Sequence, residues 1–547
     1  MNGEIVIRFA DGTQSAYATG TPLLTMAREH QMRYSSTIVA ARVNNALTDL
    51  QVRQNTDAAV DFFDLCSGQG VKVYERSLTF VLIVAAQRLF PGKDVVVEHS
   101  LGNGVYFEWL LDRAVTKTDV ALLQQEMSAI IADNLPIVRH NMPLSEAIQQ
   151  FETVGNTEKV CLLRQIERDT VSLYTCDGVV DYFYGPMVPE TGYLKHFELK
   201  FYSPGFILRF PDKSNPDSMP AFGDHPKLAQ IFFEAERWGE LLGCPTVAEL
   251  NAELASGGFL EILRVAEALH EKKVAAIADL VDERRSSTKI VLIAGPSSSG
   301  KTTFTQRLGI QLRVHGIRPV LISLDDYFLE REQTPRDANG NFDFESIQAL
   351  DLPLFNEHLV QLMAGKTVEP PRYNFKTGQR EFPGKKMKLG PEHVLLVEGI
   401  HGLNPQLTES VPRTQKLLIY ISALTQLAID RHNRIPTTDT RLIRRIVRDN
   451  QYRSHDALQT LRIWASVRSG EEVNIFPYQE EADVMFNSAL IYELSVLRQY
   501  AEPLLAKITP EYPEYLEARR LTGFLRHFRQ APDDQVPLTS ILREFIG

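Results

Sequence analysis

The sequence predicts an α/β protein of several domains, in which two small α+β units precede a parallel sheet covered by helices. A glycine-rich loop, Gly295–Thr303, separates an apolar run from a run with helical periodicity. From about residue 289 onward, apolar runs alternate with helical segments, which is typical of a buried parallel sheet. Before that point, short alternating segments bounded by glycine turns indicate antiparallel strands.

The length and composition indicate a cytoplasmic protein without membrane spans. A chain of 547 residues is expected to form roughly three or four domains. The net charge of -11 argues against non-specific nucleic-acid binding, although a local basic patch stays open. The four cysteines form no C-x-x-C pair, which favours a reducing compartment. The N-terminus lacks the pattern of a signal peptide, and no apolar run approaches the roughly 18 residues of a membrane span.

Residues 1–65 predict a small β-grasp unit. Glu4–Phe9 alternates like a strand, and Asp11-Gly12 marks a hairpin turn before a second strand at Gln14–Tyr17. Thr21 is expected to be the N-cap of a helix that runs through Glu29. Further short strands are expected at Val39–Val43 and Ala59–Phe63.

Residues 66–211 predict a second α+β unit. Its expected elements are a helix at Leu78–Phe90, a strand pair with a glycine turn at Val95–Trp109, a helix at Thr118–Asn134 and turns around Tyr184–Pro189. The segment Pro211–Pro220 is rich in Pro, Ser and Asp, which favours a linker. Residues 212–288 then form a helical connector, expected to pack on one neighbour or on both. Residues 509–547 are expected to be helices of unassigned role.

Residues 289–508 predict the domain that carries the parallel sheet. The expected strands are Ile290–Ala294, Pro319–Ser323, Val394–Val397 and Leu417–Ile421. The loop after the first strand fits G-x-x-x-x-G-K-[ST], in which glycines let backbone N–H groups surround phosphate oxygens. Lys301 reaches the terminal phosphates, and the Thr302 hydroxyl holds Mg²⁺. We therefore expect ATP or GTP with Mg²⁺, bound by Gly295, Ser297, Ser298, Ser299, Gly300, Lys301, Thr302 and Thr303.

Two further strands end in carboxylates. Asp325 and Asp326 follow the strand Pro319–Ser323, and Glu398 follows Val394–Val397. Because the carboxyl ends of parallel strands share one edge of a sheet, these acids are expected to face the phosphate loop. Asp325 is a candidate for accepting a proton from a hydroxyl, and Glu398 for holding Mg²⁺.

An arginine-rich run indicates a helix with one basic face. Arg441, Arg444, Arg445 and Arg448 share much of that face, and Arg453 follows just beyond. The cluster is either a solvated surface or a lid that closes on phosphates, and the second interpretation is favoured because a triphosphate supplies the counter-charge.

Basic and aromatic residues alternate in Pro371–Arg380, which is expected to be a loop. Tyr373 and Phe375 are candidates for stacking on a nucleobase. They are equally typical of anchors for a long loop, and this pattern leaves both interpretations open.

With these motifs in place, residues 289–508 resemble the uridine kinase and phosphoribulokinase family of P-loop kinases. The motifs that carry the resemblance are the loop Gly295–Thr303, Ser323-Leu-Asp325, Phe342-Asp-Phe-Glu345, Tyr373-Asn-Phe375 and Glu398-Gly-Ile. The resemblance implies that Asp325 is the general base and that Thr302, Asp325 and Glu398 surround Mg²⁺. It implies that Asp343 holds ribose hydroxyls, that Tyr373 and Phe375 line the base pocket, and that Arg445, Arg448 and Arg453 contact phosphates or substrate.

The sequence departs from that family where the base is read. Gly378 stands where pyrimidine nucleoside kinases carry a histidine, and His455 stands at the place of a lid arginine. The Phe342–Glu345 segment also lacks the family's proline. The phosphate-binding residues are therefore retained, while the residues that select uridine are altered.

The first 200 residues carry a separate resemblance to threonyl-tRNA synthetases. Residues 1–65 resemble the TGS domain, and residues 74–200 resemble the editing domain, on the motifs Arg88–Pro91, Gly104–Phe107 and Gly185–Pro189. The editing domain's two histidines and later cysteine and histidine correspond here to Arg76, Phe80, Phe183 and Met187. Such a set cannot hold a metal or a hydrolytic water, so editing is expected to be absent.

Taken together, these patterns predict a kinase that transfers a γ-phosphoryl group to a small-molecule hydroxyl, most favourably the 5′-hydroxyl of a nucleoside such as uridine or cytidine. Lys301, Asp325, Arg448 and Arg453 are the expected catalytic residues. The alternatives are a kinase of a non-nucleoside alcohol and a nucleotide-dependent RNA-binding or regulatory protein. Contact with tRNA through the first two units, and self-association, stay open.

Overall fold

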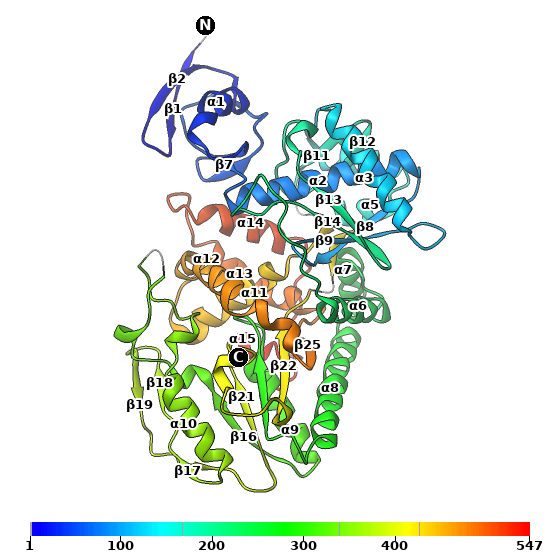
Figure 1. Ribbon diagram of the computed structural model, residues 1–547. Helices are drawn as coiled ribbons and strands as arrows, with labels where there is room; N and C mark the ends of the chain where they lie inside the picture. Colours follow the sequence, from blue (N-terminus) through cyan, green and yellow to red (C-terminus); the bar gives the residue numbers. More distant parts are fainter. Residues whose placement is uncertain (1–2, 167, 338–339, 426) are drawn as a thin grey trace.

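The computed structural model describes residues 3–166, 168–337, 340–425 and 427–547. It confirms the α/β class: a five-stranded parallel sheet forms the centre of the second half, and smaller mixed and antiparallel sheets form the first half (Figure 1). Within these ranges, no helix combines the length and apolarity that crossing a membrane requires. The domain boundaries drawn from the sequence stay predictions.

The first unit is a five-stranded sheet with one helix packed on it. Its order is β2-β1-β7-β4-β5, with β1 and β7 parallel at the centre. The bounds are β1 Glu4–Phe9, β2 Gln14–Ala18, β4 Ile38–Val43, β5 Ala46–Thr48, β7 Ala58–Asp64 and α1 Leu23–His30, and the short pair β3 Thr21–Pro22 and β6 Arg53–Gln54 lies beside them. Alternate residues of β1 are buried, so the predicted strand period is confirmed.

The predicted N-cap of α1 is wrong. Thr21 belongs to strand β3, and its hydroxyl donates a hydrogen bond to the carbonyl of Ala18 at 2.7 Å. Pro22 precedes the helix, and no side chain caps it. The pairing of Thr21 with Gln54 holds the threonine in an extended strand, which local sequence does not reveal.

The second unit contains two small sheets around a long buried helix. That helix, α2 Gly68–Leu89, begins earlier than its apolar run, because the Ser67 hydroxyl accepts a hydrogen bond from the Gly70 N–H and caps it. One sheet has the order β13-β14-β9-β8 and the other the order β10-β11-β12. The bounds are β8 Val95–Ser100, β9 Gly104–Trp109, α3 Lys117–Ala132, β10 Val138–Pro143, α4 Leu144–Thr153, α5 Thr157–Leu163, β11 Thr170–Cys176, β12 Val179–Tyr182, β13 Glu198–Tyr202 and β14 Gly205–Arg209.

The helical connector packs on both neighbours. It consists of α6 Pro226–Leu241, α7 Val247–Ser256 and α8 Phe259–Glu283. On one side, the Phe232 ring stacks on His99 of the second unit with ring centres 3.7 Å apart. On the other side, Glu271 of α8 accepts a hydrogen bond from Arg307 of the sheet domain at 2.8 Å. The sequence left open whether the connector packs on one neighbour or on both, and in the structure it contacts both.

The third unit carries the parallel sheet in the order β16-β21-β15-β22-β25. The four predicted strands are confirmed as β15 Ile290–Ala294, β16 Arg318–Ser323, β21 His393–Glu398 and β22 Lys416–Ser422, and β25 Val484–Asn487 was not predicted. The helices are α9 Lys301–Val314, α10 Leu352–Met363, α11 Thr437–Arg448, α12 Ala457–Asn474 and α13 Glu493–Leu505, followed by α14 Tyr515–Leu525 and α15 Arg543–Ile546. Figure 1 shows the last residues beside this sheet.

The third unit also contains short two-stranded sheets outside its parallel sheet. The segment Pro371–Arg380, expected to be a loop, contains the paired strands β18 Arg372–Asn374 and β19 Gln379–Glu381. The remaining pairs are β17 Thr367–Val368 with β20 Met387–Lys388, and β23 Ala428–Asp430 with β24 Asn433–Arg434. Both strands of the first hairpin are too short for a recognisable two-residue period, so sequence pattern did not reveal them.

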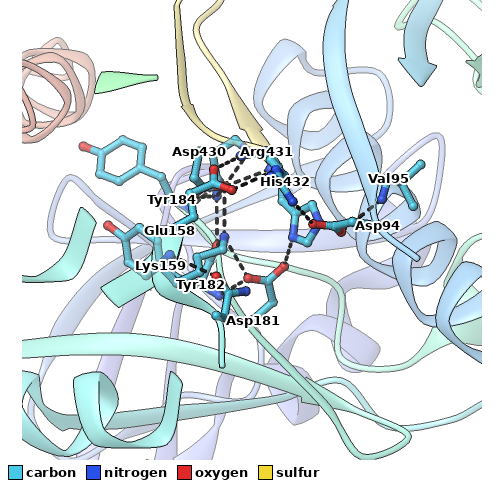
Figure 2. Close-up of polar contacts among 12 residues, drawn as sticks. Asp94, Val95, Glu158, Lys159, Asp181, Tyr182, Tyr184, Asp430, Arg431 and His432 are labelled. Atoms are coloured by element: carbon cyan, nitrogen blue, oxygen red, sulfur yellow. Dashed lines mark hydrogen bonds and ion pairs between the residues drawn. The ribbon is translucent and has the colours of Figure 1, made fainter. Parts of the chain in front are cut away.

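The hairpin β23–β24 joins the third unit to the second through a buried cluster of charges (Figure 2). The Lys159 ammonium lies 2.8 Å from Asp181 and 2.9 Å from Asp430. The His432 ring bonds to Asp181 through Nδ1 and to Asp94, at 2.9 Å, through Nε2. Since each buried charge has an opposite partner, the joint avoids the large cost of an isolated buried ion.

The pH dependence of stability is expected to reveal this joint. Burial alone would lower the pKa of His432, but the Asp181 and Asp94 carboxylates raise it to about 10. The protonated His432 contributes fully to stability below pH 6.5, the pKa of histidine in the unfolded chain. This contribution is lost as the pH rises through 10, and the free energy of unfolding falls by at most about 1.4 kcal/mol per pH unit. Thermal unfolding of the wild type should therefore show a falling midpoint over this window.

The comparison that tests this is His432→Asn, in which the slope between pH 6.5 and 10 should be flatter. The exposed His140, changed in the same way, is the matched control and should keep the wild-type slope. Equal slopes in all three proteins would contradict the assignment.

Candidate active site

The predicted acids meet the glycine loop at one edge of the parallel sheet. Glu398 ends β21 between two neighbours: Ile293 of β15 and Ser323 of β16 are its register partners. Asp325 lies two residues beyond Ser323 in a short 3₁₀ turn, Leu324–Tyr327. The structure therefore brings Asp325, Glu398 and the loop together, as strand topology predicts.

The loop Gly295–Gly300 has the tight backbone that the motif requires. A Cβ on Gly295 would lie 2.1 Å from the Ile421 carbonyl oxygen. Gly300 directly precedes α9 and has a φ of +85°, a conformation that glycine adopts without strain. The N-terminus of α9 is thereby aimed at the loop, where its partial positive charge favours an anion.

Lys301 folds back over the loop. Its ammonium donates hydrogen bonds to the carbonyl oxygens of Gly295 at 2.9 Å and Pro296 at 3.0 Å. Burial lowers the pKa of Lys301, while the carboxylates of Glu398 and Asp325 act in the opposite direction. The lysine is therefore held within reach of both acids and of any phosphate in the loop.

The acids fit a magnesium ion. The Ser323 hydroxyl donates to Glu398 Oε1 at 2.9 Å, and the Thr302 hydroxyl lies 3.5 Å from the same oxygen. Burial and the nearby Asp325 raise the pKa of Glu398 to about 7, so the two carboxylates destabilise each other's charge. In the described part of the chain, no three His, Cys, Asp or Glu side chains form a metal-binding group. Mg²⁺ needs fewer, because it takes its other ligands from phosphates and water.

The arginine helix α11 covers the loop and is buried. Arg441 Nε donates to the Ser297 carbonyl at 2.9 Å, and Arg444 donates to Glu493 at 2.8 Å. Both side chains are almost inaccessible, with exposed fractions of 1% and 0%. The solvated-face interpretation is therefore wrong.

Arg445, Arg448 and Arg453 gather around one acid. Their guanidinium groups lie 3.2, 2.7 and 3.9 Å from the Asp449 carboxylate. Arg445 also donates to the Ser297 hydroxyl at 2.7 Å. Burial, reinforced by Arg448, lowers the pKa of Arg453 to about 10, and Asp325 opposes this shift. Three positive charges thus share one negative partner beside the catalytic edge.

Two of the predicted substrate residues, Tyr373 and Phe375, lie next to Arg453. The rings of Tyr373 and Phe375 lie 5.0 Å apart, and the Arg453 guanidinium lies 5.2 Å from the Phe375 ring. Asp343 Oδ1 accepts hydrogen bonds from the N–H groups of Glu345 and Ser346, each at 3.1 Å. Its carboxylate is thus already bonded within its own turn.

The altered base-reading position is occupied by a neighbour. Gly378 has a φ of +74°, and a Cβ there would lie 2.8 Å from the Arg331 side chain. Arg331 also donates to the Phe375 carbonyl at 2.8 Å. The Arg331 guanidinium therefore fills the space beside Gly378, the position at which the sequence was expected to replace a histidine.

Two acids at the site were given no role by the sequence analysis. Glu471 of α12 accepts a hydrogen bond from the Ser297 N–H at 3.0 Å and pairs with Arg441. Glu345 Oε2 is buried without a hydrogen-bond partner among the described residues. Burial, with Glu471, raises the pKa of Glu345 to about 7. Glu471 lies in a helix, where no local signal pointed to it, and Glu345 was noted only as the end of the Phe342–Glu345 motif.

The four positions that correspond to the synthetase editing ligands lie close together. The rings of Phe80 and Phe183 pack edge to face at 5.4 Å, and both are fully or nearly buried. Arg76 donates to the Pro186 carbonyl at 2.7 Å, and Met187 is buried beside it. The absence of editing stays a prediction, which this apolar packing supports.

Comparison with known families supports both resemblances. Residues 290–494 match the model of the phosphoribulokinase / uridine kinase family. The N-terminal part is similar to threonine–tRNA ligases: that of Acidithiobacillus ferrooxidans is 33% identical over 195 residues, covering 36% of this chain and 30% of the ligase. That of Desulforamulus reducens is 29% identical over 196 residues, covering 36% and 31%. The chain thus spans less than a third of these curated relatives.

Two solved structures are similar to part of this chain. A possible uridine kinase from Bacillus stearothermophilus is 20% identical, covers 38% of this chain and 97% of its own, and has a TM-score of 0.26. D-glycerate 3-kinase from Cryptococcus neoformans var. grubii is 17% identical, covers 47% and 87%, and has a TM-score of 0.23. The comparison that relates the sheet domain to kinases is therefore the match of residues 290–494 to the phosphoribulokinase / uridine kinase family model.

The Glu471–Arg441 pair is expected to be essential for stability. Glu471→Ala leaves the buried Arg441 guanidinium without its partner, which should lower the free energy of unfolding by about 3–5 kcal/mol. Denaturant titration followed by circular dichroism measures the loss. The adjacent Glu472, which is 47% exposed, is the matched control, and Glu472→Ala should change stability by less than about 1 kcal/mol. Equal losses would contradict the structural role of Glu471.

Proposed function

We propose that this protein transfers the γ-phosphoryl group of ATP or GTP to a hydroxyl of a small molecule, with the 5′-hydroxyl of a nucleoside such as uridine or cytidine as the leading acceptor. The observation that carries the proposal is the meeting of Asp325, Glu398 and the Gly295–Thr303 loop beneath α11. The family match of residues 290–494 supports the kinase class.

In the proposed mechanism, Asp325 orients the acceptor hydroxyl and takes its proton. The hydroxyl oxygen forms a bond to the γ-phosphorus as the bond to the β–γ bridging oxygen breaks, and the nucleoside diphosphate leaves. Thr302, Glu398 and Asp325 would hold Mg²⁺, which would supply neutralising charge on the phosphate oxygens. Lys301 exchanges its bonds to Gly295 and Pro296 for the terminal phosphates.

The lid arginines divide into two roles in this proposal. Arg441 and Arg444 bond to loop carbonyls and buried acids, so they fix the lid against the loop. Arg448 and Arg453 share Asp449 and carry surplus positive charge, so they are the groups available for the transferred phosphoryl. Preorganised charge of this kind is the main source of catalysis in phosphoryl transfer.

A non-nucleoside alcohol is the second candidate acceptor. The Asp343 carboxylate accepts hydrogen bonds within its own turn, and the Arg331 side chain fills the space at Gly378. A residue expected to hold ribose and a position expected to read the base therefore both have other partners. In favour of a nucleoside, the Phe375 ring is 44% exposed beside Tyr373 and offers a stacking face.

The synthetase-like units are proposed to regulate the lid. Arg434 of β24 pairs with Glu75 at 2.8 Å, and α11 begins three residues later at Thr437. At the first turn of α11, Asp439 pairs with Arg520, whose carbonyl accepts a hydrogen bond from Tyr184. A ligand of the second unit, with tRNA as one candidate, would therefore act on the lid.

A kinase panel tests the proposal. The protein is incubated with Mg²⁺, ATP or GTP, and separate nucleosides, sugars and polyols, and nucleoside diphosphate release is measured. Lys301→Met should reduce turnover by roughly 10²–10³ because one preorganised charge is lost. The exposed Lys385, changed to Met, is the control and should keep full activity. Failure of every acceptor with both donors would reject the kinase assignment.

Asp325→Asn separates chemistry from binding. Without a proton acceptor, kcat should fall by about 10²–10⁴, while nucleotide affinity measured by calorimetric titration stays within a few-fold. Glu332→Gln neutralises an exposed acid shortly after it and should leave both values unchanged. If kcat survives in the Asp325 variant, another group takes the proton.

A further inference from the structure

The segment 540–547 lies against the phosphate loop, far in sequence from every motif of the site. It contains the short helix α15, and its apolar side chains Ile541, Leu542, Phe545 and Ile546 are all buried. They belong to the same core cluster as strands β15 and β22. Figure 1 shows this end of the chain within the sheet domain.

Glu544 accepts a hydrogen bond from a backbone N–H of the phosphate loop. Its Oε2 accepts a hydrogen bond from the Thr303 N–H at 3.1 Å. Thr303 is the third residue of α9, whose first N–H groups are those that bind phosphates in a loop of this sequence. Glu544 also lies close enough to Lys301 to influence its pKa. A carboxylate therefore sits where a nucleotide must place phosphate oxygens.

The residues beside Glu544 also contact the phosphate loop and the lid. Ile541 covers Gly300 closely, since a Cβ on that glycine would lie 2.5 Å from the isoleucine Cγ2. The Phe545 ring lies 5.0 Å from the guanidinium of Arg444, the lid arginine that reaches the Ser298 carbonyl. The segment thus presents an anionic group and, next to it, a flat ring on an arginine, which are the two chemical features of a nucleotide.

In addition to its buried apolar side chains, a set of polar contacts holds the segment in place. Gln451 donates to the Ile546 carbonyl at 3.1 Å, and Arg543 donates to the carbonyls of Asp533 at 2.9 Å and Val536 at 2.6 Å. The first of these contacts comes from the π-helical turn Asp449–Arg453 that follows α11. Release of the segment would therefore also loosen the turn that carries Arg453.

We propose that segment 540–547 is an autoinhibitory element that occupies the nucleotide site and that the nucleotide displaces. The inference rests on the proposed function, because it concerns the same site. In this proposal the Glu544 carboxylate and a nucleotide phosphate compete for the Thr303 N–H. The apparent nucleotide affinity therefore falls in proportion to the fraction of protein in which the segment is released.

Glu544→Gln tests the competition while preserving the shape of the side chain. Without the negative charge the closed state weakens, so the full-length variant should bind a fluorescent ATP analogue with Mg²⁺ roughly ten-fold more tightly than the wild type. Asp534→Asn, which removes an exposed carboxylate shortly before the segment, is the matched control and should bind like the wild type. Hydrogen exchange measures displacement directly: ATP should accelerate exchange in 540–547 and slow it in 295–303.

The outcomes separate this inference from the proposed function. Equal or weaker binding by Glu544→Gln, or unchanged exchange in 540–547 when ATP is bound, overturns the autoinhibitory role and leaves the kinase proposal intact. If neither the wild type nor the variant binds nucleotide, both proposals fail.

Discussion

The arrangement of helix α11 over the phosphate loop depends on two guanidinium groups that have almost no contact with solvent. Arg441 and Arg444 are buried between α11 and the phosphate loop, where each must find acceptors because an unpaired buried charge is prohibitively costly. They find them in loop carbonyls, in Glu471 and in Glu493. The position of α11, the shape of the loop and the placement of α12 and α13 therefore satisfy a single electrostatic constraint.

The same constraint links distant parts of the chain. The hairpin β23–β24 leads directly into α11, and its residues are bound to the second unit by the paired charges around Lys159 and His432 (Figure 2). A continuous set of packed, hydrogen-bonded elements thus runs from the synthetase-like unit to the loop. This chain of contacts is the structural basis for the regulatory role that we propose.

The sequence by itself determined the parts of this protein that depend on local chemistry. The glycine spacing of the phosphate loop, the carboxylates after two apolar strands and the period of the main helices predicted the parallel sheet and brought Asp325 and Glu398 to one edge. These features can be predicted from the sequence because a strand, a glycine turn and a strand end are each specified by neighbouring residues. Short elements stabilised by distant partners, such as β3 and β25, were mispredicted or missed.

Only the tertiary structure decided what each charged group faces. The spacing of the α11 arginines favoured a lid over a solvated face but did not reveal their partners, because the acids that pair with Arg441 and Arg444 come from α12 and α13. Glu544 reaches Thr303 across 241 positions of sequence, and Arg331 reaches the space at Gly378 through a neighbouring loop. No local pattern encodes these contacts, because they arise when separate elements are packed together and each buried charge must acquire a partner.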